Sequence, residues 1–390
     1  MKKNKLTVAQ IGCGAFAEAQ DFPNLTKNPK ISLKWCCDIS KDRAKEMAKK
    51  FNVPEVTTDF NAPINDPEVD MIKISTSHEV HLPIIEAAAR NGKHIFCEKP
   101  MALEEDEAFK IISAVRKGKV KLCVDLNRRM APSMHSLKAN WLKHRANPRH
   151  QSWRYVEVER ELFPEEKQAQ FLVRVQDESY SYRLVHLDPM KGGGLVFGET
   201  VHWLDLACWL YAPQYPVEIQ ASGSARFSHC INLKFSGGDT TTILFSCGGT
   251  FDYPKELYEI SSSGALFRNN FFVENEYYGV PGLDRELFPM QHDPLKNVGK
   301  EGGFSAYMKK YAERAQKTKG NIKNAAPFSV DKGHENMLNT FVEAILKDKP
   351  SPCDEMAGFM STYLAKLAIK SIELRQALPV PLDKVVPCIP

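Results

Sequence analysis

The sequence lacks three features that would place it in a special class. No stretch of about 18 unbroken apolar residues occurs among its 390 residues, so we expect no transmembrane helix and no membrane partner. No Cys-x-x-Cys pair occurs among its ten cysteines, and most of them lie in apolar runs, so we expect reduced thiols and no metal site. No basic stripe accompanies the net charge of +4, which argues against nucleic acid as a partner.

A secretory leader is not expected either. The basic residues 1–5 precede only a short strand-like run, whereas a secretory apolar region would be longer. Together with the reduced cysteines, this predicts a cytoplasmic protein. The composition is ordinary for a globular chain, with 43% apolar and 26% charged residues, and the length allows two domains of roughly 150 residues or more.

Strand-like and helix-like segments alternate through the first third of the chain. Strands are expected at 6–11, 31–37, 71–75, 94–97 and 120–124, and helices at 41–51, 82–91 and 104–117. Short connections between such segments indicate a parallel sheet with helices on both faces. We therefore expect an α/β domain over 1–126, with a doubly wound parallel sheet.

The pattern changes after residue 126. Strands are expected at 153–159, 217–222, 225–235, 240–247 and 257–262, and helices at 199–211, 304–317, 332–347 and 356–375. Most of the strands are joined by short turns, which indicates a mostly antiparallel sheet. Residues 127–390 are therefore predicted to form an α+β domain.

A glycine turn follows the first strand and matches a dinucleotide-binding turn. In Gly12-Cys13-Gly14-Ala15-Phe16-Ala17, Gly12 permits the tight turn and Gly14 lets the main chain approach a pyrophosphate. Ala17 is small enough for close packing of helix on sheet, and the helix N-terminus then faces the phosphates. The alternative is a purely structural turn.

An acidic residue ends the second expected strand. Asp38 lies 26 residues after Gly12, near the offset at which a carboxylate binds the ribose hydroxyls. An acid here favours NAD over NADP, because it would repel a 2′-phosphate.

Glu98-Lys99-Pro100 follows the strand expected at 94–97. A lysine at the carboxyl end of such a strand lies at the crevice where doubly wound folds bind ligands. Pro100 restricts Lys99 to extended geometry. Taken alone, such a lysine is more often a solvated surface residue.

These motifs together resemble the Gfo/Idh/MocA oxidoreductase family. The resemblance rests on the glycine turn, the run Ala87-Ala88-Ala89-Arg90-Asn91-Gly92-Lys93-His94, Glu98-Lys99-Pro100, and a second block of Gly192-Gly193-Gly194 with His202 and Asp205. It is continuous over 6–130 and resumes at 190–212. It implies a Rossmann domain, an open-faced sheet domain, NAD(P)-dependent hydride transfer at a sugar or polyol carbon, and a homo-oligomer (dimer or tetramer) that covers the open sheet face.

The resemblance also implies the site residues. The cofactor would contact Gly12, Gly14, Ala15, Phe16, Ala17, Asp38, Ser75, Thr76, Ser77, His78, His81, Glu98, Lys99 and Asn127. Lys99 would lie beside the reacting oxygen, with His202 facing it, and the Lys99–Pro100 bond is expected to be cis.

Two departures from the family pattern stand out. Many members carry aspartate four residues before the second-block histidine, but Gly198 holds that place here and Glu199 is next to it. On a helix Glu199 and His202 share a face and could pair. The second departure is Asn127-Arg128-Arg129. Candidate substrate contacts are therefore Lys99, Arg128, Arg129, His186, Glu199 and His202.

Two acid–base assignments are open. A base works best when its pKa lies near the working pH, which suits His202 without adjustment. Lys99 would need a lowered pKa, which partial burial and a nearby nicotinamide cation would supply. We favour His202 as the base and Lys99 as the group that positions and polarises the oxygen.

The leading functional prediction is NAD-dependent oxidation or reduction of a sugar or glycoside, leaning on overall likeness to C3 of a hexoside (the DgpA-like glycoside 3-dehydrogenases). Alternatives are an inositol or polyol dehydrogenase, a redox-assisted glycosidase or lyase, a sugar-to-sugar hydride exchanger that retains NAD, and a non-catalytic NAD-binding regulator.

Overall fold

The computed structural model describes residues 3–146, 168–177, 187, 192–249, 254–290, 298–317 and 330–381. These residues form two compact units that interleave along the chain. The first unit contains 3–127, 192–205 and 334–366, and the second contains most of the remainder. The predicted functional division into 1–126 and 127–390 stays a prediction.

The first unit is built on a six-stranded parallel sheet in the order β3-β2-β1-β4-β5-β6. Its strands are β1 (Leu6–Ile11), β2 (Ile31–Cys37), β3 (Glu55–Thr57), β4 (Met71–Ile74), β5 (His94–Cys97) and β6 (Leu122–Val124). The order reverses between β1 and β4, and the carboxyl ends of strands at such a point form the ligand-binding edge. The predicted doubly wound sheet is confirmed.

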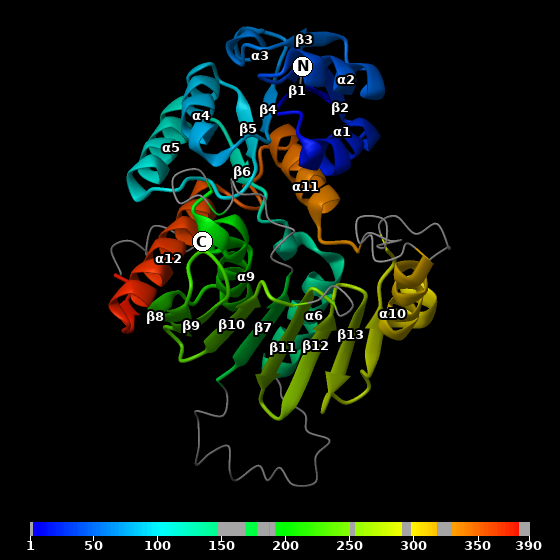
Figure 1. Cartoon of the computed structure of the whole chain (residues 1–390), viewed down its shortest axis with the longest axis vertical. Coiled ribbons are helices and arrows are strands. Elements are labelled where there is room, and N and C mark those ends of the chain that lie inside the picture. The colour runs from blue at the N-terminus through cyan, green and yellow to red at the C-terminus, as the bar shows by residue number, and fades with distance from the viewer. Residues whose placement is uncertain are drawn as a thin grey trace. The chain divides into compact units, whose positions relative to one another are not determined.

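Helices cover both faces of this sheet. Its helices are α1 (Phe22–Lys27), α2 (Lys41–Phe51), α3 (Asn61–Asn65), α4 (His81–Arg90), α5 (Glu105–Gly118) and, from the carboxyl-terminal part of the chain, α11 (His334–Leu346). In Figure 1, α4 and α5 lie on one side of the strands and α1 and α2 on the other. The apolar core beneath α1 and α2 is made by Cys13, Ala17, Phe22, Cys36, Ala44 and Met47.

Two helical segments contain a π-turn. The helix after the glycine turn widens over η1 (Ala17–Asp21), and the helix before α9 (Val201–Tyr211) widens over η6 (Val196–Thr200). A π-turn inserts an extra residue into a helix, so it redirects side chains and loosens main-chain carbonyls, and such turns are frequent at functional sites. Each of these two turns supplies acceptors to a lysine, as described below.

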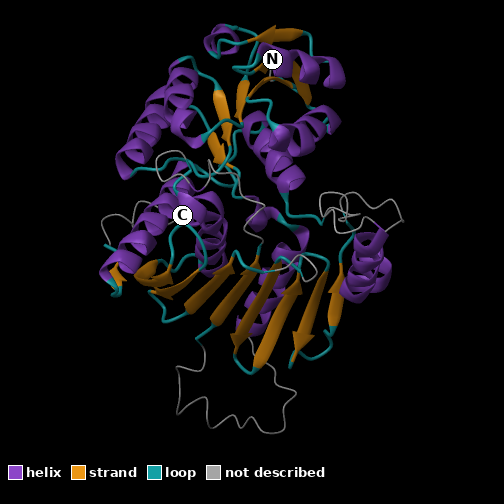
Figure 2. Cartoon of the chain, viewed as in Figure 1, coloured by secondary structure: helices purple, strands orange, loops and turns teal. Residues whose placement is uncertain are grey.

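The second unit contains a nine-stranded sheet in the order β14-β13-β12-β11-β7-β10-β9-β8-β15. Its strands are β7 (Gln170–Gln176), β8 (Pro216–Gly223), β9 (His229–Phe235), β10 (Thr240–Ser246), β11 (Glu256–Ser262), β12 (Ala265–Asn270), β13 (Glu274–Tyr278), β14 (Arg285–Leu287) and β15 (Leu378–Pro379). Only β7 and β10 pair in parallel among these strands. The predicted mostly antiparallel sheet is confirmed (Figure 2).

Side chains alternate between the two faces of this sheet. Phe171, Ile231, Ile243, Tyr258 and Phe267 are buried on one face. The opposite face carries half-buried or exposed residues such as Leu172, Leu244 and Leu257. The predicted oligomer, which would cover this second face, stays a prediction.

Within the described residues, the remaining helices are α6 (Pro132–Ala146), α9, α10 (Val298–Lys317) and α12 (Glu355–Leu374), and short 3-10 turns form η2 (His78–Val80) and η3 (Asn127–Met130). No helix in the described part of the chain is long and apolar enough to cross a membrane. The strand expected at 153–159 lies outside the described residues.

Candidate functional site

The glycine turn leaves an open surface at the end of β1. Gly12 has a φ of +90°, and a Cβ atom there would lie 2.3 Å from the main-chain oxygen of Ser75, so only glycine fits. Its N–H donates to the Cys37 carbonyl at 2.8 Å. A Cβ on Gly14 would meet no atom within 4 Å. The turn is therefore held tightly against its neighbours while its outer side is free for a ligand.

The residues after Gly14 continue this arrangement. Ala15 and Phe16 are exposed and begin a helix, whereas Ala17 is buried in the core. The first N–H groups of a helix have no partners within the helix, and the helix dipole favours an anion there. An exposed helix start after a glycine turn fits the pyrophosphate of a dinucleotide. Gly12, Gly14, Ala15 and Phe16 would hold it, whereas Ala17, predicted as a further contact, lies in the core and lets the helix pack closely on the sheet.

Asp38 connects the end of β2 to the glycine turn. One oxygen of its carboxylate accepts the N–H of Cys13 at 2.8 Å, and the other accepts the N–H of Ser40 at 2.8 Å. Asp38 is half-buried, and the next side chain, Ile39, is 97% exposed. Carboxylate oxygens can accept more than one hydrogen bond each, so Asp38 can still receive a ribose hydroxyl.

Arg43 lies beside the same turn, but its guanidinium is already engaged. Its Nε donates to the Cys13 carbonyl at 2.6 Å, and its terminal nitrogens pair with Glu18 at 2.5 Å and Glu46 at 2.8 Å. Hydrogen bonds from Arg43 and Lys50 lower the pKa of Glu18 to about 2. This cation therefore has a carboxylate partner without any nucleotide phosphate.

The segment Ser75–His81 begins at the end of β4. The Ser75 N–H donates to the Ile11 carbonyl at 2.8 Å, which joins the segment to β1. Thr76, Ser77 and His78 are half-buried or exposed. His81 is fully buried, and its Nδ1 lies 3.0 Å from the Pro100 carbonyl oxygen. Burial lowers the pKa of His81 to about 4, so its ring is neutral and joins this segment to the turn after β5.

Lys99 is held from the second block of the chain. The Lys99–Pro100 bond is cis, as expected from the resemblance. The Lys99 ammonium donates to the main-chain carbonyl of Gly198, and it lies 3.7 Å from a carboxylate oxygen of Glu199. Gly198 and Glu199 both belong to the π-turn η6, whose wider geometry leaves carbonyls available for a donor.

His202 and Asp205 lie just beyond this π-turn, on α9. His202 and Asp205 are buried, and Glu199 is half-buried. All three belong to the same compact unit as Lys99. The structure therefore brings Lys99 and Glu199 into contact and places His202 three residues further along the same helical segment.

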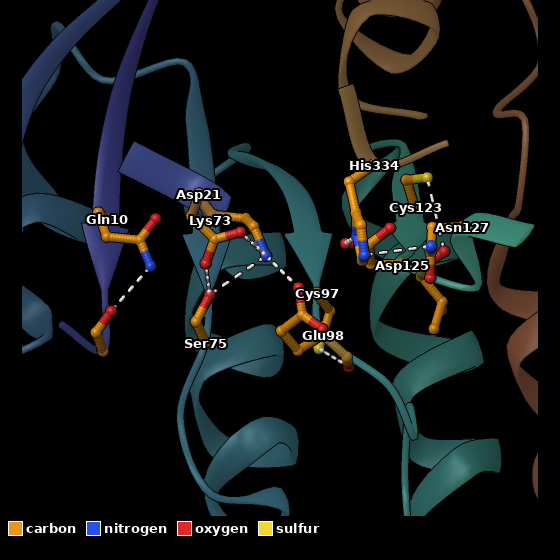
Figure 3. A network of polar contacts seen from close by, with 12 residues as sticks. Gln10, Asp21, Lys73, Ser75, Cys97, Glu98, Cys123, Asp125, Asn127 and His334 are labelled. Atoms are coloured by element: carbon orange, nitrogen blue, oxygen red, sulfur yellow. Dashed lines mark hydrogen bonds and ion pairs between the residues drawn. The ribbon is translucent and has the colours of Figure 1, made fainter. Parts of the chain in front are cut away.

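A buried polar cluster lies beneath the carboxyl ends of β4, β5 and β6 (Figure 3). Lys73, in β4, is 2% exposed, and its ammonium lies 2.7 Å from Glu98, 3.2 Å from Asp21 and 3.2 Å from the Ser75 hydroxyl. Although burial disfavours its charge, Asp21 and Glu98 raise the pKa of Lys73 above its ordinary value. Lys73 is therefore an ammonium.

The carboxyl groups of this cluster have opposite pKa shifts. Burial and the nearby carboxylates of Asp125 and Asp21 raise the pKa of Glu98 well above its usual range. Burial also acts to raise the pKa of Asp125, but His334 and Lys73 outweigh it and lower that pKa. Of Glu98 and Asp125, Glu98 is thus the group that takes up a proton first.

His334 and Asn127 complete the cluster. The His334 Nδ1 lies 3.2 Å from Asp125, and its Nε2 lies 3.2 Å from the Asn127 amide nitrogen. The ring of the exposed Phe16 meets the His334 ring edge-on, with centroids 5.7 Å apart. Asn127 is completely buried, and its side chain contacts His334 within the cluster.

The predicted substrate residues Arg128, Arg129 and His186 have different positions. Arg128 belongs to the second unit and forms a buried bidentate pair with Glu256, at 2.9 and 3.1 Å. Such a pair is expensive to break, so this geometry does not support a substrate role for Arg128. Arg129 is half-buried at η3, and His186 lies outside the described residues.

Sequence reasoning missed Lys73, Asp21, Asp125 and His334. One signal was present, because Lys73 interrupts an otherwise apolar strand, Met71-Ile72-Lys73-Ile74, and a lysine inside a parallel sheet needs buried partners. Asp21 and His334 had no comparable signal. The π-turn η1 directs Asp21 inward, and tertiary packing brings His334 to the sheet.

Comparison with known proteins supports this assignment of the fold. The profile of the Gfo/Idh/MocA family, described as "Oxidoreductase family, NAD-binding Rossmann fold", matches residues 6–126. A trans-1,2-dihydrobenzene-1,2-diol dehydrogenase from Mus musculus is 32% identical over 257 residues, which are 64% of this chain and 69% of that protein. A myo-inositol 2-dehydrogenase from Thermotoga maritima is 22% identical over 360 residues, 87% and 89% of the two chains.

A solved structure shows the same fold over nearly the whole length. The crystal structure of a myo-inositol dehydrogenase from Corynebacterium glutamicum superposes with a TM-score of 0.70 at 16% identity, over 97% of this chain and 99% of the other. With the glycine turn, Asp38 and Lys99 in place, the chain belongs to the Gfo/Idh/MocA family of oxidoreductases, whose nucleotide-binding domain is an NAD-binding Rossmann fold.

Proposed function

We propose that this protein is an NAD-dependent dehydrogenase that acts on a secondary hydroxyl, or the matching ketone, of a sugar, glycoside or related ring polyol. The observation that carries the proposal is the Lys99 ammonium at the carboxyl end of β5, held between the Gly198 carbonyl and the Glu199 carboxylate. A lysine held in this way has a fixed position and keeps a donor for a substrate oxygen.

The acid–base roles follow from the side chains. The bound nicotinamide supplies the hydride acceptor or donor. Lys99 binds the reacting oxygen and stabilises negative charge that develops on it. His202 takes the hydroxyl proton during oxidation and returns it during reduction. Glu199 orients Lys99 and shares its helical segment with His202. The reverse assignment, with Lys99 as the base, makes the same residues essential.

NAD is the proposed cofactor. Asp38 presents a carboxylate where a 2′-phosphate would lie in NADP, and it would repel that phosphate. Arg43, whose Nε donates to the Cys13 carbonyl of the turn, is paired with Glu18 and Glu46. Neither group favours a second phosphate, which supports NAD as the proposed cofactor.

The substrate class rests on the relatives. The names of the two relatives above give a dihydrobenzene diol and an inositol as their substrates. Both compounds are six-membered rings with adjacent secondary hydroxyls. We propose a substrate of this kind. Within it, the finer proposal is C3 of a hexoside, with an inositol as the rival.

The test uses purified protein and begins without added nucleotide. Part of the sample is denatured, and any released nicotinamide is identified. Native protein is then mixed with NAD and a panel of glucosides, free sugars and inositols, with Lys99→Ala as the control. Lys99-dependent formation of NADH and a keto product, detected by absorbance and mass spectrometry, supports the proposal.

Other outcomes identify the alternatives. Retained NAD with release of a free aglycone, or with hydride exchange between sugars, and no free NADH would indicate a redox-assisted lyase or a sugar-to-sugar exchanger. Nucleotide binding without turnover on any substrate would contradict the dehydrogenase proposal and favour a regulator.

A further inference from the structure

We infer that Lys73 is a positioning residue that holds the nucleotide-binding turn and the Lys99 segment in one fixed arrangement. The inference rests on the proposed function, because it assigns Lys73 to the same cofactor and substrate site. Nothing in the family resemblance marks this residue. It is carried by three contacts that converge on one buried ammonium.

The first contact leads to the nucleotide-binding turn. Asp21 ends the π-turn η1, which begins at Ala17, immediately after the glycine turn. Its two carboxylate oxygens are divided between the Lys73 ammonium, at 3.2 Å, and the Ser75 hydroxyl, at 2.5 Å. Asp21 is 5% exposed. The helix that presents its N-terminus to the phosphates is therefore anchored to β4 by a buried ion pair.

The second contact also leads to that turn, through Ser75. Lys73 lies 3.2 Å from the Ser75 hydroxyl, and the Ser75 carbonyl oxygen is the atom that a Cβ on Gly12 would strike. The Ser75 N–H donates to the Ile11 carbonyl. A shift of Ser75 would therefore move the surface against which Gly12 packs.

The third contact leads to Lys99. The Lys73 ammonium lies 2.7 Å from Glu98, whose N–H donates to the Ile74 carbonyl at 2.9 Å. Glu98 is fixed at both its main chain and its side chain, and Lys99 is the next residue. The ammonium also lies 4.8 Å from the centroid of the Phe96 ring, which restricts its position further.

Loss of the Lys73 ammonium would affect both the nucleotide-binding turn and the Lys99 segment. Without Lys73, Asp21 and Glu98 would be buried carboxyl groups with no cation between them, so they would separate or take up protons. The helix start and the Lys99 segment would then lose their common anchor. Displacements of about 1 Å in a catalytic arrangement can cost on the order of a hundredfold in rate.

The variants are Lys73→Met, which keeps the length of the side chain, and Asp21→Asn, which removes one charge with little change of shape. The matched control is Lys93→Met. Lys93 is also a buried lysine beside the same sheet, 7% exposed, and it donates to the carbonyls of Asp66 and Val69 at 2.7 Å each. It precedes β5, at the opposite end of that strand from Glu98.

Two measurements separate positioning from general stability. Binary dissociation constants for NAD and NADH are measured by calorimetry well below the Tm of each variant, and kcat and KM are measured with the panel substrate. We expect Lys73→Met to weaken nucleotide binding and to lower kcat, each by about tenfold or more, and Asp21→Asn to weaken nucleotide binding at least about threefold. We expect Lys93→Met to lower Tm while its constants stay within about threefold of wild type.

The inference would be overturned if a folded Lys73→Met variant had the wild-type nucleotide dissociation constants and kcat. It would also be overturned if Lys93→Met weakened nucleotide binding and lowered kcat as much as Lys73→Met does. If Lys73→Met does not fold, Asp21→Asn decides the question through the same nucleotide titration. If the wild-type protein turns over no substrate of the panel, the proposed function fails, while the binary titration still tests the role of Lys73.

Discussion

The Lys99 ammonium lies 3.7 Å from the Glu199 carboxylate and donates to the carbonyl of Gly198, the residue before it. One π-turn thus supplies both an anionic and a neutral acceptor to one lysine. The family pattern leads one to expect aspartate at position 198. Here the carboxylate comes from the next residue, and the main chain at 198 takes part directly.

Lys99 is the residue on which turnover should depend most strongly. We expect Lys99→Met to lower kcat/KM by about a hundredfold or more, because it removes the donor to the reacting oxygen. Binary NADH affinity should change by less than about threefold, because the glycine turn is untouched. Steady-state kinetics measure kcat/KM, and calorimetry measures the NADH affinity. A variant with near wild-type turnover would exclude Lys99 from catalysis.

Glu199 should act through Lys99. We expect Glu199→Gln to lower kcat/KM by roughly tenfold to a hundredfold, because the lysine loses its charged neighbour while the shape of the side chain is kept. The pH dependence of kcat/KM should change as well, since the variant alters the charge around the catalytic groups. Glu343→Gln, at a half-buried pair with Lys30, is the control and should leave the profile as it is. Identical pH profiles for wild type and Glu199→Gln would contradict this role.

Asp38 should set the preference between NAD and NADP. We expect Asp38→Ser to lower the ratio of the NADPH to the NADH dissociation constant by about tenfold, because the repulsion of the 2′-phosphate is removed. Adding Glu18→Gln should lower it further, because Arg43 loses one of its two carboxylate partners. Fluorescence titration with both nucleotides measures the ratio, and an unchanged ratio in the double variant would refute the assignment.

His81 should make the stability of the protein depend on pH. Its folded-state pKa is about 4, against 6.5 for an ordinary histidine, so the unfolded chain takes up the proton first. The contribution of His81 to the free energy of unfolding is therefore fully present above pH 6.5. It decreases by on the order of 3 kcal/mol as the pH falls from 6.5 to 4. Urea unfolding of wild type and His81→Gln across this range should show the steeper decline in wild type. Parallel curves would rule out His81 as the cause.

The first unit was largely predictable from the sequence, because its strands are continuous apolar runs and its helices end at clear signals. The bounds of β1, β2, β5 and α2 agree with the prediction at every residue. In the second unit, β12 and β13 were missed. Polar residues such as Arg268, Asn269 and Glu276 fill these strands, and their cross-strand pairs stabilise the sheet in place of an apolar pattern.

The candidate site likewise contains residues that local motifs predicted and residues whose contacts only the fold reveals. The glycine turn, Asp38 and Lys99 are local motifs, so spacing alone placed them at the carboxyl edge of the sheet. The contact between Arg128 and Glu256 was not predictable, because nothing in Asn127-Arg128-Arg129 indicates that a carboxylate far along the chain binds its guanidinium. Lys73 meets Asp21 at the end of a π-turn, which no residue pattern in this sequence predicts.

Transfer of a labelled hydride from substrate to NAD tests whether this protein is a Lys99-dependent dehydrogenase. Wild-type protein and Lys99→Met are each mixed with NAD and with methyl glucosides or inositols that carry deuterium at a single ring carbon, and the NADH is analysed by mass spectrometry. We expect deuterium in NADH from one ring carbon, C3 for a hexoside, in wild type and far less in the variant. The proposal would be contradicted if no labelled substrate transferred deuterium to NADH, or if Lys99→Met transferred as much deuterium as wild type.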